Sequence, residues 1–100
     1  MKRTEKKILN ETLRNQSQEV FGEIIAELRE KADLSQDDFA YECGVNRSFI
    51  SKIEAGQTTV SLITLMKLAI GLNMQASDIL IMLEKRIKEQ TAKSAKKLKA

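Results

Sequence analysis

The fold is decided by residues 34–56, which read LSQDDFAYECGVNRSFISKIEAG. The stretch predicts two short helices joined by a tight turn. Ser35 is a favoured N-cap residue, and two aspartates follow it in the first turn, where negative charge suits the helix dipole. Gly44 stands where the first helix should end, because glycine takes a positive φ without steric cost. Asn46 then caps a second helix, which ends at Gly56.

The second of these helices has one apolar face and one polar face. Phe49, Ile50 and Ile53 fall at helical spacing, so we expect them to face the core. The side chains left outside lie on the first two turns and are nearly all hydrogen-bond donors: Asn46, Arg47, Ser48, Ser51 and Lys52. The first turns of the second helix are the part that a helix-turn-helix places in the major groove. The pattern therefore predicts a surface that reads double-stranded DNA.

The same stretch resembles the lambda-repressor-like (XRE/Cro-type) helix-turn-helix family of phage repressors and small bacterial regulators. The resembling positions are residues 34–36, 39–40, 44–45 and 50–56. The resemblance implies an all-α fold, a five-helix domain with an additional N-terminal segment and a C-terminal helical extension. We accordingly divide the chain into three parts. Residues 1–18 are an N-terminal extension for which a helix is one interpretation, residues 19–83 are the DNA-binding domain, and residues 84–100 are a basic C-terminal extension.

The resemblance also assigns roles to individual residues. Arg29 and Glu54 match a structural ion pair between the first and third helices, and Gln36 matches a residue that contacts phosphate and braces the recognition helix. Base edges would be contacted by Asn46, Arg47 and Ser48, and an arginine can bond bidentately to guanine. Ser51 and Lys52 lie one turn further on. Further phosphate contacts are expected from Ser35 and from the loop residues Gln57, Thr58 and Thr59.

Each of these assignments has a plainer alternative. In the alternative interpretation Arg29 and Glu54 are ordinary surface charges. Gln36 is then only a solvated residue in the first turn of its helix. Asn46 is otherwise a cap alone, Arg47 is a solvated arginine, and the loop is a simple connector.

Three more helices are predicted around residues 34–56. Before them, residues 19–32 place apolar side chains on one helix face: Phe21, Ile24, Ile25, Leu28 and Ala32. After them, Ser61 caps a fourth helix whose inward face is predicted to be Leu62, Leu65, Met66, Leu68, Ala69 and Leu72.

A fifth helix begins near Ala76 and contains five consecutive apolar residues at 79–83. Five in a row exceed one helix face, and the excess predicts a twofold dimer contact that includes Ile79, Ile81 and Met82. Tight packing within one subunit is the alternative. Dimeric helix-turn-helix proteins read two half-sites about one turn of DNA apart.

Composition excludes several classes of function. The chain has one cysteine and no histidine, so zinc sites, an internal disulfide and histidine-dependent catalysis are not expected. We predict no catalytic residues, metal, cofactor or small-molecule ligand. The N-terminus does not read as a signal peptide and no long apolar run follows, which predicts a cytoplasmic protein without a membrane partner.

The net charge of +3 is distributed unevenly. Residues 1–20 carry +2 and residues 84–100 carry +5, whereas residues 21–60 carry −4. The N-terminal end allows three interpretations: a solvated tail, an arm that attracts phosphate, or a helix that contacts a partner. The C-terminal end allows two: a helix extension that frays into a solvated tail, or a segment that attracts phosphate. The acidic centre argues against strong nonspecific DNA binding by the centre alone.

Two functions remain from this sequence. The first is a sequence-specific, dimeric transcriptional regulator, more often a repressor, that binds a palindromic operator with residues 46–54 in the major groove. The second is a protein-interaction module of the same fold, such as the antitoxin half of a toxin–antitoxin pair. An enzyme is the least favoured, because no glycine-rich phosphate loop is present and the carboxylates fall in first turns or on solvated faces.

Overall fold

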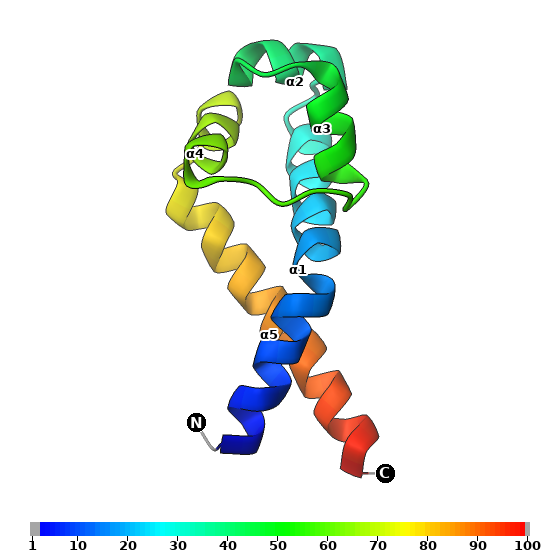
Figure 1. Cartoon of the computed structure of the whole chain (residues 1–100). Coiled ribbons are helices and arrows are strands. Elements are labelled where there is room, and N and C mark those ends of the chain that lie inside the picture. The colour runs from blue at the N-terminus through cyan, green and yellow to red at the C-terminus, as the bar shows by residue number, and fades with distance from the viewer. Residues whose placement is uncertain (1–2, 100) are drawn as a thin grey trace.

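The computed structural model describes residues 3–99, with side chains for residues 4–96. Within this range the chain forms five helices and no strand (Figure 1). The helices are α1 (Arg3–Lys31), α2 (Gln36–Cys43), α3 (Arg47–Glu54), α4 (Leu62–Gly71) and α5 (Ala76–Lys99). The all-α, five-helix prediction is confirmed.

The helix-turn-helix has the capping that the sequence predicts. Oγ of Ser35 accepts the amide of Asp38 at 3.0 Å, and α2 begins at the next residue after Ser35. Gly44 has φ 70°, the left-handed conformation that ends α2. Oδ1 of Asn46 accepts the amide of Phe49 at 2.8 Å, which starts α3. Gly44 and Asn46 together fix the turn between α2 and α3.

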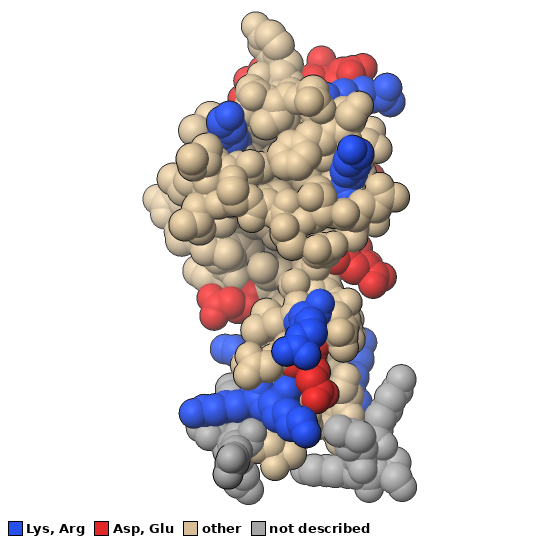
Figure 2. Space-filling model, viewed as in Figure 1, with Lys and Arg blue, Asp and Glu red and all other residues tan. Residues whose placement is uncertain are grey.

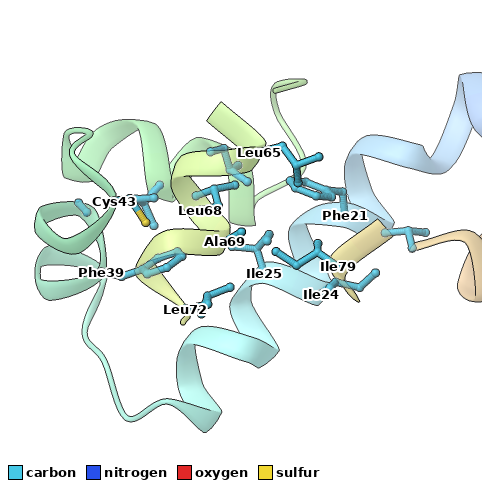
Figure 3. Close-up of a cluster of buried hydrophobic side chains, with 14 of the residues drawn as sticks. Phe21, Ile24, Ile25, Phe39, Cys43, Leu65, Leu68, Ala69, Leu72 and Ile79 are labelled. Carbon is cyan, nitrogen blue, oxygen red and sulfur yellow. The ribbon is translucent and has the colours of Figure 1, made fainter. Parts of the chain in front are cut away.

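The core lies where α1, α2, α3 and α4 meet α5, and it extends along α5 as far as Ile87 (Figure 3). Its largest fully buried side chains come from all five helices: Ile24, Ile25, Phe39, Ile50, Ile53, Leu68 and Ile79. Burying side chains of this size contributes about 1.5–3 kcal/mol each. Because α3 contributes two of these residues, its orientation is set by the core.

The predicted inward face of α4 is wrong at two positions. Leu62 is 81% exposed and Met66 is 56% exposed, whereas Leu65 and Leu68 are buried. α4 is apolar nearly all round, so spacing alone could not decide which of its faces is buried. Its outer face is instead a stripe of exposed apolar side chains: Leu62, Ile63, Met66 and Ile70.

The predicted dimer residues of α5 differ in how much surface they keep. Ile79 is fully buried within its own chain, so assigning it to an interface with a second copy is wrong. Met82 is half-buried and packs against the core, whereas Ile81 is 61% exposed. Only Ile81 among the three therefore has a mainly free surface.

α1 begins much earlier than the predicted first helix. It is continuous from Arg3, and its N-terminal half crosses the C-terminal half of α5 below the core (Figure 1). Ile8, Thr12 and Ile87 are buried at this crossing. Thr12 returns a hydrogen bond from its hydroxyl to the carbonyl of Ile8 at 3.0 Å, which satisfies its polar atom. We call residues 4–18 of α1 and 84–96 of α5 the stalk.

Candidate nucleic-acid interface

The outer face of α3 carries the predicted reading residues. Ile50 and Ile53 are fully buried and Phe49 is half-buried. The remaining side chains of the first two turns are exposed, and with Gln57 four of them line one shallow hollow of ≈ 420 Å³: Arg47, Ser48, Ser51 and Lys52. The hollow contains hydroxyl, amide, guanidinium and ammonium groups. Such donors match the acceptors of phosphates and of guanine in the major groove.

α3 is held close to α1 at Gly22, a residue that the sequence analysis did not single out. A Cβ atom at this position would collide with the carbonyl oxygen of Ile53 and lie 2.9 Å from that of Glu54. The absence of a side chain therefore lets the two helices touch. A glycine in the middle of an amphipathic helix destabilises that helix by about 1 kcal/mol relative to alanine. A glycine at such a position is therefore the sequence feature that indicates a close packing contact.

The ion pair expected between Arg29 and Glu54 is present. Nε of Arg29 donates to Oε2 of Glu54 at 2.6 Å, and Nη2 donates to Oε1 at 3.0 Å. Nη1 of Arg29 donates to the carbonyl of Leu34 at 2.8 Å. The side chains are only 14% and 8% exposed, and the carboxylate partner raises the pKa of Arg29. The pair fixes the end of α3 against α1 and the start of α2.

Gln36 joins this network from the first turn of α2. Its Nε2 donates to Oε1 of Glu54 at 3.1 Å, so it braces α3 through that carboxylate. The bracing role that the resemblance implies is therefore present. Its phosphate contact stays a prediction, as does that of Ser35, whose hydroxyl oxygen caps α2 but whose proton remains free to donate.

The first residue of α3 lies beside an acidic group. Nε of Arg47 is 3.6 Å from Oδ1 of Asp37, and both side chains are well exposed, at 64% and 74%. An exposed pair of this kind contributes about 0–1 kcal/mol, so the guanidinium is readily released to a stronger partner. Asn46 is likewise not consumed by its cap, because capping uses Oδ1 and leaves the side-chain amide to donate.

The loop after α3 is divided between two surfaces. Gln57 joins the hollow on α3. Thr58 and Thr59 instead border a separate, mostly apolar hollow of ≈ 250 Å³, where Phe21 and Leu65 also lie. Oγ1 of Thr58 donates to the carbonyl of Thr59 at 3.1 Å. Five of the ten predicted DNA-binding residues therefore line the hollow on α3, and the other five do not.

Three further observations concern the residues that the structure describes. Among them, no three cysteine, aspartate or glutamate side chains come together as a metal site would require. Cys43 is buried beneath Gly71, and burial raises the pKa of its thiol to about 11. No single helix in the described range could cross a membrane, although α4 and residues 76–96 would suffice together by length and composition, with a 107° bend between them.

Comparison with known proteins places the chain among regulators of the same fold. A family model described as helix-turn-helix matches residues 25–79. Control protein C.MunI of Mycoplasma sp. is 41% identical over 66 residues, which cover 65% of this chain and 89% of that protein. Control protein C.BamHI of Bacillus amyloliquefaciens is 37% identical over 62 residues, 61% of this chain and 76% of that one.

A solved structure agrees with these sequence relatives. The restriction-modification controller protein C.AhdI of Aeromonas hydrophila superposes with a TM-score of 0.59 at 36% identity, over 61% of this chain and 92% of that chain. The three similar proteins are named as control or controller proteins. The match of the family model ends at residue 79, before the part of α5 that belongs to the stalk.

Proposed function

The chain belongs to the lambda-repressor-like helix-turn-helix family of DNA-binding transcriptional regulators, and we propose that it binds a palindromic operator as a dimer. In this proposal α3 lies in the major groove and the protein acts as a repressor in the cytoplasm. The name of C.AhdI, a restriction-modification controller protein, supports genes of a restriction-modification system as the target.

One observation carries the proposal: the core fixes α3 from behind and leaves its donors outside. Ile50 and Ile53 are fully buried, while the neighbouring positions are exposed and polar. The Arg29–Glu54 pair and the contact at Gly22 hold α3 at its C-terminal end. A rigidly held row of donors can discriminate bases, because hydrogen bonds to base edges depend on position.

The roles of the donors follow from their reach and charge. Arg47 and Ser48 stand on the first turn, which enters the groove deepest, and are assigned to base edges with Asn46. Lys52 and Gln57 lie further along the same hollow and are assigned to phosphates. Gln36 and Ser35, at the N-terminus of α2, are assigned to a neighbouring phosphate.

The exposed apolar stripe of α4 supports the dimer. Ile63 is 70% exposed and Ile70 is 68% exposed, and these residues lie two helical turns apart on the same face. Leu62 extends the stripe toward Leu80 of α5, since both border one hollow. Apolar side chains in such a row mark an association surface. The dimer contact proposed here therefore lies mainly on α4, with Leu80 and Ile81 beside it.

The proposal is tested by comparing DNA from upstream of the chain's own gene with a random duplex of equal length. We expect tight binding to one upstream site and weak binding to the random duplex. Arg47→Ala should lower the affinity for that site by about 1–3 kcal/mol and bring the two affinities together. Lys52→Ala is the matched control and should weaken binding to both duplexes alike.

A second measurement tests the dimer. Ile63→Lys with Ile70→Lys should elute from gel filtration at the size of one chain, because buried lysines would destabilise an apolar interface. Elution of this variant at the size of two chains would remove α4 from the proposal. Equal affinity of the unchanged protein for the upstream and random duplexes would instead favour the protein-interaction module.

A further inference from the structure

The stalk is the feature of this chain that the proposed function does not use. Its two segments lie outside residues 25–79, which the helix-turn-helix model matches. The two segments cross at the buried residues Ile8, Thr12 and Ile87. An ion pair from Arg86 to Glu27 ties the start of the α5 segment to the domain part of α1. The stalk is therefore an ordered, two-helix projection from the DNA-binding domain (Figure 1).

The charge of the stalk is opposite to that of the domain that bears it. Residues 4–18 and 84–96 contain eight lysines and arginines against four glutamates, for +4. Residues 19–83 contain five lysines and arginines against ten acids, for −5. Figure 2 shows lysine and arginine side chains gathered over the stalk, with few over the domain above it. Positive charge is thus concentrated at one end of the molecule.

The lysines of the stalk have no structural use that the described residues show. Lys85, Lys88, Lys93 and Lys96 are all exposed. None of the ion pairs within residues 4–96 includes any of them, and Arg86 alone of the stalk cations is paired. A stalk that only needed to hold together would place opposite charges across the two helices, since like charges repel. The charge is instead turned toward solvent.

The reading surface, in contrast, is short of positive charge. Its cations are Arg47 and Lys52, and the first of these lies beside Asp37. Sequence-independent affinity for DNA comes from cations that neutralise phosphates and release counterions. With two cations and an acidic surrounding, α3 supplies little of this affinity. Of the residues assigned to phosphates above, only Lys52 carries a positive charge, so further cationic contacts with phosphate would have to come from another part of the molecule.

We propose that the stalk is a second nucleic-acid surface, which binds the phosphate backbone of duplex DNA without regard to sequence. The inference rests on the proposed function, because α3 would hold the stalk near DNA and so raise its effective concentration there. In this proposal α3 selects the site on DNA, and the stalk raises the affinity for any duplex. An acidic protein surface is the competing partner for such a stalk.

The experiment removes two stalk charges and measures their effect on salt dependence. In Lys93→Gln with Lys96→Gln, glutamine keeps the helix propensity and removes the charge. Binding to a random duplex and to the upstream site is titrated at several KCl concentrations. For each lysine that contacts a phosphate, the slope of log K against log[salt], which is negative, should become shallower by about 0.9 on both duplexes.

The matched control lowers the net charge by the same amount at the other end of α5. Gln75→Glu with Ser77→Glu changes two exposed positions that flank the start of that helix. The control should leave the salt slope close to that of the unchanged protein. Identical slopes for the lysine variant and the control would overturn the proposal, and loss of binding to an acidic protein only would assign the stalk to a protein partner.

The two proposals fail in different ways. If the stalk binds DNA, the lysine variant keeps the ratio of upstream to random affinity, because both affinities fall together. If α3 does not read sequence, that ratio is already one in the unchanged protein and does not respond to Arg47→Ala. An unchanged slope with an intact ratio would therefore refute the stalk alone.

Discussion

The DNA-binding domain and the stalk are both helical, but each is stabilised by different interactions. The domain encloses a core to which all five helices contribute, with Phe39, Ile24 and Ile50 fully buried. The stalk is two crossing helices with three buried side chains and one ion pair to Glu27. Burial fixes every element of the domain, including α3. The two helices of the stalk lie against each other, but their lysine side chains face solvent.

The comparison predicts that core substitutions and stalk substitutions differ most in their effect on unfolding. Phe39→Ala should lower the free energy of unfolding by about 3–5 kcal/mol, because it leaves a cavity among fully buried neighbours. Leu13→Ala in the stalk removes a side chain that is already 42% exposed and should change stability by no more than about 0.5 kcal/mol. Urea unfolding of both variants checks the difference. Equal losses would contradict the distinction between the two regions.

The next largest effect is expected where α1 changes from stalk to domain. Glycine to alanine inside a helix normally stabilises by about 0.5–1 kcal/mol. Gly22→Ala should do the reverse and cost about 1–3 kcal/mol, because its Cβ collides with the backbone of α3. Thermal unfolding gives the sign directly. A higher melting temperature would show that α1 and α3 are not in close contact.

The network behind α3 gives a third test. Glu54→Gln keeps the shape of the side chain but leaves Arg29, only 14% exposed, without its counter-charge. The free energy of unfolding should fall by about 1–3 kcal/mol. Asp37→Asn, which removes the exposed partner of Arg47, is the matched control and should change stability by no more than about 1 kcal/mol. Comparable losses in both variants would make the buried pair no more structural than the exposed one.

The smallest effect concerns the ion pair at the base of the stalk. The hydrogen bond from Arg86 lowers the pKa of Glu27 below 4.5. A carboxylate with a lowered folded-state pKa stabilises the fold above its unfolded pKa, and this contribution is lost as pH falls through the lowered value. Glu27→Gln should therefore narrow the difference in stability between neutral and acidic pH slightly. Amide hydrogen exchange in the stalk, followed at neutral and at acidic pH, measures this difference in stability. If the difference is the same in Glu27→Gln and in the unchanged protein, the ion pair contributes nothing to stability.

Much of the domain could be predicted because its signals are local. The caps Ser35 and Asn46 and the turn glycine Gly44 each act within a few residues, and the structure confirms all three. The two buried isoleucines of α3 follow from spacing alone. The Arg29–Glu54 pair came from the family resemblance rather than from local chemistry, and it too is present.

The features that could not be predicted depend on contacts between distant parts of the chain. Which face of α4 is buried cannot be read from a helix that is apolar nearly all round, so Leu62 and Met66 were assigned wrongly. The sequence predicts a helical C-terminal extension but not its crossing with the start of α1. That crossing buries Thr12, a residue that is polar in the sequence and whose hydroxyl is satisfied within its own helix. The close approach at Gly22 likewise depends on where α3 lies.

The central claim is that the exposed face of α3 reads DNA, and NMR titration with a duplex containing the upstream site tests it most directly. We expect the largest amide shift changes at residues 46–52 and at Gln57, with small changes along the apolar stripe of α4. Large changes confined to residues 62–70, with α3 unaffected, would contradict the claim.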